Sequence, residues 1–331
     1  MEKIAFYAEA DPKIGIGHVV RLKNTQNLIK NKKIVWFFSG DKKFADSFLK
    51  KYYYLNKIDN KNFTNTFDKI LRKEKINKIF VDIANRNNLK NSKSFEKFFK
   101  FFKKKNYFLI SFDDPRLKIL SDISIIPYVF DKKKIIVENK NVKKIHGKKY
   151  FFSSPYFNFY KKKNKVIKKK IKKIFIFLTG YNTSNSVKDI LKNFSNTKYD
   201  ITIYSNGSKI INNNKNIRLI GFRENLAKLY FDSDVAIVGE GLSRYETALL
   251  GVPTVLIYSF EALKRTNDLA WKFIRLKTSK VFTPGLSFAN LKFFIESKMT
   301  YPQRKILSNN AKKFFDLNGA ARFSNIIKKF L

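Results

Sequence analysis

A histidine beside two glycines lies near the start of the chain, in the segment over residues 10–21 that reads ADPKIGIGHVVR. Gly15 and Gly17 can adopt backbone conformations with positive φ and let the chain pass close to a ligand. An apolar run over residues 4–8 precedes this segment, and apolar residues at helical spacing follow it. His18 is therefore expected at the first turn of a helix, where free N–H groups suit a phosphate or a developing anion.

The expected place of His18 also bears on its protonation. The positive field of a helix N-terminus disfavours the imidazolium form, so the neutral ring is able to take up a proton. His18 is thus a candidate general base. The alternative is structural, because many loops between a strand and a helix carry glycines only to make the turn. The spacing also differs from the GxGxxG pattern of dinucleotide-binding folds.

A second glycine loop, over residues 239–253, reads GEGLSRYETALLGVP. It predicts a helix that opens on glycines and ends at Gly-x-Pro before a strand over residues 254–258. Backbone N–H groups at such a helix start can receive phosphate. Glu246 lies about one turn into the helix and is able to accept hydrogen bonds from ribose hydroxyls. The alternative is that Glu246 is an ordinary first-turn acid favoured by the helix dipole.

Acidic residues follow two other apolar runs of the first half. Asp82 ends a run over residues 78–82, and Asp113 with Asp114 ends a run over residues 108–114. Ligands of parallel α/β sheets bind beyond the carboxyl ends of the strands, and these acids are expected on that edge together with His18. Equally, Asp is common in turns and caps without any functional role.

Strand-like and helix-like segments alternate along both halves, which predicts parallel sheets with helices on both faces. Further strands are expected over residues 33–40 and 52–58 in the first half, and over 173–180, 201–205, 216–221 and 234–239 in the second. The pattern weakens over residues 131–173, where runs of lysine predict a solvated interdomain linker. The expected fold is α/β with two Rossmann-like domains, at residues 1–160 and 161–331.

The composition narrows the function classes. A chain of 331 residues fits two domains of ordinary size. It has no cysteine, which excludes disulfides, thiolate metal sites and a cysteine nucleophile. We expect no metal and no cofactor. The first residues lack the pattern of a signal peptide, and no apolar stretch has the length of a membrane helix. The expected location is cytoplasmic.

The formal charge of +43, from 69 basic and 26 acidic residues, raises the question of nucleic-acid binding. Nearly all of the excess is lysine, spread from end to end among Asn, Ile, Phe and Tyr, as expected of an AT-rich genome. No recognition motif accompanies it, so we expect no dedicated nucleic-acid binding and at most peripheral contact with an anionic membrane surface. The charge favours anionic substrates such as nucleotide diphosphates. A basic nucleic-acid or membrane-surface binder without catalysis is the alternative from another class.

Five stretches together resemble a known family. The stretches follow one another in the same order as in the PseG/SpsG family, which the chain resembles. This family comprises the UDP-2,4-diacetamido-2,4,6-trideoxy-β-L-altropyranose hydrolase of pseudaminic acid biosynthesis and a spore coat polysaccharide protein. The stretches that carry the resemblance are residues 10–21, 111–114 (SFDD), 177–180 (FLTG), 224–246 and 318–322 (NGAAR).

The resemblance implies a GT-B-like fold, with two Rossmann-like domains facing a central cleft, and hydrolysis of a UDP-sugar. It implies that His18 is the base that activates water, with Asp11 nearby. It places UDP at Gly241, Leu242, Ser243 and Glu246. The remaining substrate- or nucleotide-binding residues that it implies are Gly15, Gly17, Arg21, Asp113 and Gly180. A glycosyltransferase of the same architecture is the alternative, in which the same base would activate an alcohol.

Overall fold

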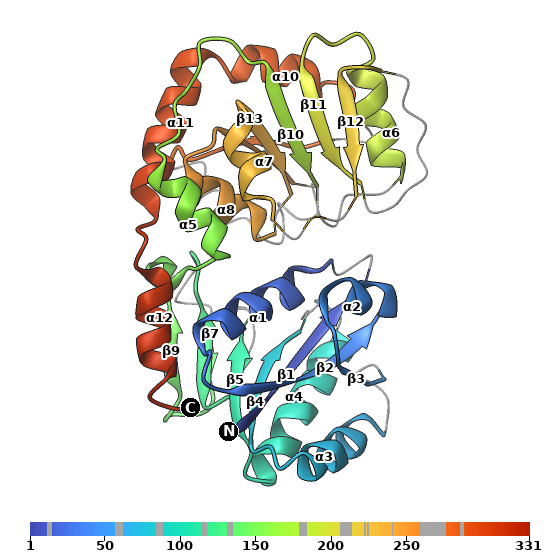
Figure 1. Cartoon of the computed structure of the whole chain (residues 1–331), viewed down its shortest axis with the longest axis vertical. Coiled ribbons are helices and arrows are strands. Elements are labelled where there is room, and N and C mark those ends of the chain that lie inside the picture. Colours follow the sequence, from blue (N-terminus) through green and yellow to red (C-terminus); the bar gives the residue numbers. More distant parts are fainter. Residues whose placement is uncertain are drawn as a thin grey trace. The chain divides into compact units, whose positions relative to one another are not determined.

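The computed structural model divides into two compact units (Figure 1). Unit 1 comprises Met1–Phe152 and Asn318–Leu331, and unit 2 comprises Ser153–Leu317. The structure describes residues 1–11, 15–56, 62–83, 89–113, 118–130, 135–178, 184–205, 214–221, 223, 225–239, 241–258, 276–284 and 288–331.

Unit 1 is built on a seven-stranded sheet with the order β3-β2-β1-β4-β5-β7-β9, in which every pair of neighbours is parallel. Buried on both faces, β1 and β4 read as nearly continuous apolar runs, as expected for central parallel strands. A separate two-stranded ribbon joins β6 (Lys118–Ile119) and β8 (Ile136–Val137). The strands of the large sheet are β1 (Lys3–Ala10), β2 (Lys33–Gly40), β3 (Tyr53–Tyr54), β4 (Lys78–Asp82), β5 (Phe108–Phe112), β7 (Ile123–Ile126) and β9 (Lys143–His146).

Phenylalanines of two helices pack against one face of this sheet. Phe63 and Phe67 of α3 meet Phe98 and Phe102 of α4 in a buried aromatic cluster. Burial of such side chains contributes about 1.5–3 kcal/mol each, so these phenylalanines stabilise the core. The helices of unit 1 are α1 (Gly17–Leu28), α2 (Lys42–Phe48), α3 (Phe63–Lys73), α4 (Leu89–Lys104), the short 3₁₀ helix η2 (Lys148–Tyr150) and α12 (Gly319–Ile327).

Unit 2 has a six-stranded parallel sheet with the order β12-β11-β10-β13-β14-β15. Its strands are β10 (Lys173–Phe177), β11 (Asp200–Tyr204), β12 (Ile217–Ile220), β13 (Val235–Val238), β14 (Thr254–Ile257) and β15 (Lys280–Phe282). Its helices are α5 (Pro155–Lys162), α6 (Ser184–Asn193), α7 (Ala227–Asp232), α8 (Ser243–Leu250), α10 (Leu291–Lys298) and α11 (Tyr301–Phe314). The predicted α/β class with two Rossmann-like domains is confirmed.

The expected linker over residues 131–173 differs from what the structure shows. It contains β9, which pairs with β7 in the sheet of unit 1, and α5 of unit 2. Its lysines are not all solvated, because Lys165 is buried and its ammonium group donates to the Ser233 carbonyl at 2.6 Å. Burial lowers the pKa of Lys165 to about 8.

The expected domain bounds also differ from the two units. The chain passes into unit 2 at Ser153 rather than at residue 161, and its last segment, from Asn318, returns to unit 1 as α12. There Phe323 of α12 packs against Phe152, with ring centroids 4.6 Å apart. Among the described helices, none has both the length and the apolar character that crossing a bilayer requires.

Candidate active site

The glycine loop and α1 form at the carboxyl end of β1, as predicted. Gly15 has φ +77° and its N–H donates to the Asp11 carbonyl at 2.7 Å, which closes the turn before the helix. Gly17 is the first residue of α1, and the side chain of the N-cap residue Ile16 makes no capping hydrogen bond. The first-turn N–H groups are therefore not capped by that side chain. Residues 12–14 lie outside the described part.

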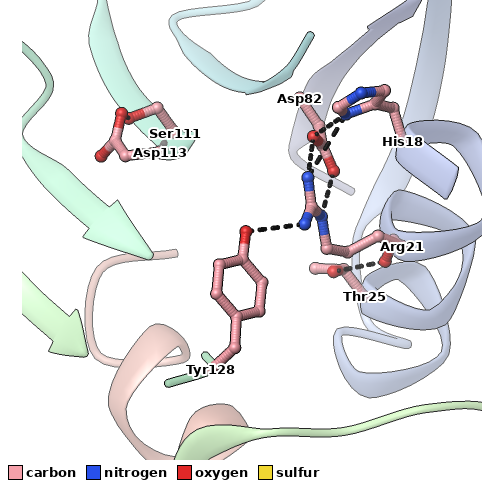
Figure 2. A network of polar contacts seen from close by, with 7 residues as sticks. All are labelled: His18, Arg21, Thr25, Asp82, Ser111, Asp113 and Tyr128. Carbon is pink, nitrogen blue, oxygen red and sulfur yellow. Dashed lines mark hydrogen bonds and ion pairs between the residues drawn. The ribbon is translucent and has the colours of Figure 1, made fainter. Parts of the chain in front are cut away.

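His18 is joined to Asp82, which ends the neighbouring strand β4 (Figure 2). The Nδ1 atom of His18 lies 2.6 Å from Oδ1 of Asp82, whose side chain is fully buried. Arg21, one turn further along α1, donates from Nε to Oδ2 at 2.6 Å and from Nη2 to Oδ1 at 2.5 Å. One buried carboxylate thus holds both the imidazole and a guanidinium group.

The charges around Asp82 decide its protonation. Burial by itself would raise the pKa of Asp82, but the charges and hydrogen bonds of Arg21 and His18 outweigh this effect and hold it below its ordinary value. Asp82 is consequently an ionised acceptor at neutral pH, so His18 Nδ1 must carry the proton that they share. In the neutral ring this tautomer leaves Nε2 as the acceptor, which is what a general base needs.

The guanidinium group of Arg21 forms hydrogen bonds with other side chains of the protein. Besides Asp82, its Nη1 donates to the Tyr128 hydroxyl at 2.8 Å, and its guanidinium carbon lies 4.8 Å from the centre of the Phe112 ring. Thr25 donates to the Arg21 carbonyl at 2.9 Å (Figure 2). The Tyr128 and Phe112 contacts hold the guanidinium group of Arg21, which in turn holds the Asp82 carboxylate.

Glu9, near the end of β1, is a carboxyl group that the sequence reasoning passed over. Its Oε1 accepts hydrogen bonds from the Tyr7 hydroxyl at 3.0 Å and from Ser39 Oγ at 3.4 Å. Burial raises the pKa of Glu9, while the charge of His18 opposes this and that of Asp11 adds to it. The sequence does carry a signal for Glu9, because it is an acidic residue at the end of an otherwise apolar predicted strand.

Asp113 lies apart from the His18 group in Figure 2. It is 2% exposed and accepts a hydrogen bond from Ser111 Oγ at 2.6 Å, while Ser111 Oγ also contacts Ser121 Oγ at 2.7 Å. The expectation that His18, Asp82 and Asp113 follow strands at one sheet edge holds. Only the first two are brought into contact. Asp114 lies outside the described residues.

The second glycine loop leads into α8, as predicted, with Gly241 and Leu242 before the helix and Ser243 as its first residue. The N-cap residue Leu242 supplies no side-chain capping bond. Glu246 is 8% exposed, accepts a hydrogen bond from Ser153 Oγ at 2.8 Å, and has a pKa raised by burial to about 7. Gly180 lies outside the described residues.

The two helix starts and the paired imidazole define the available chemistry. The described residues contain no group of three or more His, Cys, Asp or Glu side chains placed to hold a metal ion. His18 can accept a proton from a hydroxyl group, and the starts of α1 and α8 can receive anionic groups on backbone N–H groups. Within unit 1, His18 at the start of α1 suits proton removal beside an anionic group held on that helix start.

Three solved structures share the fold over nearly the whole chain, each with a TM-score of 0.58. MurG of Acinetobacter baumannii is 12% identical, with 99% of this chain and 100% of that one covered. A putative UDP-N-acetylglucosamine 2-epimerase of Listeria monocytogenes is 11% identical, with 99% and 96% covered. CalG4, the calicheamicin glycosyltransferase, is 9% identical, with 100% and 98% covered.

These likenesses show a GT-B-like fold, and at such identities they show the fold alone. The chain matches no family model and no curated protein.

Proposed function

We propose that the protein is a nucleotide-sugar-dependent glycosyltransferase, in which His18 removes the proton from an acceptor hydroxyl group. The observation that carries this proposal is the 2.6 Å contact between His18 Nδ1 and the buried Asp82 carboxylate, itself held by Arg21. This is the arrangement of an oriented base, in which a carboxylate fixes the tautomer and stabilises the imidazolium ion that forms.

In the proposed step, the acceptor oxygen replaces the nucleoside diphosphate at the anomeric carbon of the donor sugar. The proton of the acceptor hydroxyl passes to Nε2 of His18 as the oxygen forms a bond to the anomeric carbon of the donor sugar. The bond from that carbon to the diphosphate oxygen breaks, and its electron pair leaves with the nucleoside diphosphate. A placed base of this kind typically contributes ~10²–10⁴-fold to the rate.

The start of α8 is the proposed nucleotide-binding element. Backbone N–H groups at a helix start suit a diphosphate, and Gly241, Leu242 and Ser243 are the backbone proposed to receive it. Glu246 is the proposed partner of the ribose hydroxyls. Two solved structures that share the fold are named as UDP-N-acetylglucosamine 2-epimerases. Their substrate supports a donor that carries UDP.

Hydrolysis of a UDP-sugar is the second candidate function, because the segment from Asp11 to Arg21 resembles the PseG/SpsG loop. Water would then take the place of the acceptor hydroxyl at His18. The chemistry at the base is the same in both cases, so the acceptor decides between them.

UDP release separates the two candidates. The protein is incubated with UDP-N-acetylglucosamine and with UDP-linked diacetamido-trideoxy sugars, each with and without saccharide or lipid-linked acceptors. Release that requires an acceptor supports the transferase, and release in water alone supports the hydrolase. His18→Gln should abolish either activity. The matched control is His146→Gln, because His146 lies on β9 and forms a hydrogen bond with Ser124 of the neighbouring strand β7, not with the His18 group.

Stabilisation by UDP tests nucleotide binding separately from turnover. A ligand at a hundredfold excess over its dissociation constant adds about 2.7 kcal/mol to the free energy of unfolding. A protein that UDP does not stabilise and that releases no UDP from any of these donors would contradict both candidate functions.

A further inference from the structure

A pocket of about 540 Å³ in unit 2 lies beside the edge strand β15, where α10 ends and α11 begins. Its walls include Lys277 and Ser279, which precede β15, and Lys298 at the end of α10. It therefore lies at the amino end of β15. The α8 loop follows β13 at the carboxyl end of the same parallel sheet, so the pocket is separate from the proposed nucleotide site.

The charge of this pocket has one sign. Among the described residues, Lys277, Lys280 and Lys298 line it, and no acidic side chain does. In the described part of the chain, these three lysines form no ion pair. Three unpaired ammonium groups around one hollow form a site for an anionic headgroup, because a phosphate there would meet charge that nothing else neutralises.

The rest of the wall is apolar. Val281, Phe294, Ile306 and Leu307 face the same pocket, and Ile306 is 43% exposed. A volume of this size is ordinary for a small-molecule site. An aliphatic chain that covered the exposed part of this wall would bind more tightly with each CH₂ group that it takes out of water. The pocket thus combines a cationic rim with an apolar wall.

Two local features show that this wall is not ordinary surface. Ser279 is 3% exposed, and its Oγ has no hydrogen-bond partner in the described structure. Buried hydroxyl groups normally have one. Lys277 has φ +49°, a left-handed backbone conformation that is uncommon outside glycine and is found at ligand-binding segments.

We propose that this pocket binds the phosphate headgroup and the first part of the aliphatic chain of an anionic amphiphile. The lysines neutralise the phosphate, and the chain lies along Phe294 and Ile306. The site is distinct from catalysis at His18 and does not depend on it. The same chemistry is offered by a phospholipid in a bilayer and by a free alkyl phosphate, and the experiment separates these sources.

Calorimetric titration of the whole protein with dodecyl phosphate, below its micelle concentration, tests the proposal. We expect binding at least about tenfold tighter than that of inorganic phosphate, since the chain adds apolar burial. Lys298→Glu should weaken it by about tenfold or more, because an attraction becomes a repulsion. Ile306→Gln, an exposed position that should tolerate the change, should weaken dodecyl phosphate but not inorganic phosphate.

Lys188→Glu is the matched control, because it makes the same charge change at an exposed position of α6 in the same unit. If it weakens binding as much as Lys298→Glu, the net charge alone is responsible and the proposal is overturned. Equal binding of dodecyl phosphate and inorganic phosphate would overturn it too. Competition by phosphatidic acid vesicles, but not by phosphatidylcholine vesicles, assigns the ligand to a bilayer. If phosphatidic acid vesicles do not compete with dodecyl phosphate, the ligand is assigned to a free amphiphile.

Discussion

Asp82 makes the orientation of His18 depend on a single buried carboxylate. In Asp82→Asn the side chain keeps its shape but loses the charge that requires a proton on Nδ1 of His18. We expect the rate of UDP release to fall by ~10²–10⁴-fold. Arg21 would also lose its charged partner, so the thermal midpoint should fall as well.

A second ion-paired carboxylate of unit 1 provides the control for that experiment. Asp122 pairs with Lys103 at 2.5 Å and accepts the Leu109 N–H at 2.8 Å, away from His18. Asp122→Asn should lower stability while turnover per folded molecule stays unchanged. Full activity in Asp82→Asn would remove the support for an oriented base.

The position of Glu246 predicts a pH-dependent stability. In the folded protein its pKa is about 7, against an ordinary value of 4.5. Between these values the unfolded chain releases the proton that the folded one keeps, so rising pH favours unfolding. The free energy of unfolding should fall by up to about 3 kcal/mol between pH 4.5 and pH 7, compared with Glu246→Gln.

Urea titrations of both proteins across this pH range measure the difference, and other titrating groups cancel between them. A difference that stays constant with pH would show that Glu246 ionises at its ordinary pKa.

Residue types alone identified His18 and placed Asp82 on the same sheet edge. Their contact depends on β4 lying next to β1, an order that is set by packing rather than by local sequence. The bond from Arg21 to Tyr128 joins residues 107 positions apart. Such tertiary partners leave no periodic signal in the sequence, so the role of Arg21 in holding Asp82 could not be predicted.

Among the elements, the central strands were predicted most directly because both of their faces are buried. By contrast, β9 lies at the edge of its sheet and reads Lys-Lys-Ile-His, with only Ile145 fully buried. One apolar residue in four gives no recognisable alternation of apolar and polar residues. The sequence over residues 143–146 therefore predicts a linker rather than a strand. Its pairing with β7 became evident only from the folded backbone.

We expect one added methyl group at Gly319, the first residue of α12, to lower the stability of the protein strongly. A Cβ atom at Gly319 would lie 1.9 Å from the carbonyl oxygen of Phe151, well inside contact distance. Gly319→Ala should therefore displace α12 and its contacts, including the hydrogen bond from Ser324 to the Leu28 carbonyl. We expect a loss of about 1–3 kcal/mol or more in the free energy of unfolding.

Gly221→Ala serves as the control for this substitution, because a Cβ atom there meets nothing within 4 Å. Chemical denaturation of both variants measures the loss. Equal stabilities would mean that the Phe151 backbone can move away without cost.

At the scale of the whole molecule, the charge of +43 predicts that salt stabilises the protein. Self-repulsion destabilises a compact state of such high charge. The screening length falls from about 30 Å at 0.01 M salt to about 8 Å at 0.15 M. The urea midpoint should therefore rise as sodium chloride is added over this range. A midpoint that falls instead would show that the local ion pairs outweigh the net repulsion.

The return of α12 to unit 1 has a consequence for how the protein is made. Unit 2 is an insertion between two parts of unit 1, and the second of those parts is synthesised after unit 2. All of unit 2 is therefore synthesised before unit 1, which carries His18, is complete. This reverses the usual order in which the N-terminal domain finishes folding first. Because Gly319 adjoins Phe151, a short linker from residue 152 to residue 318 would make unit 1 a continuous chain.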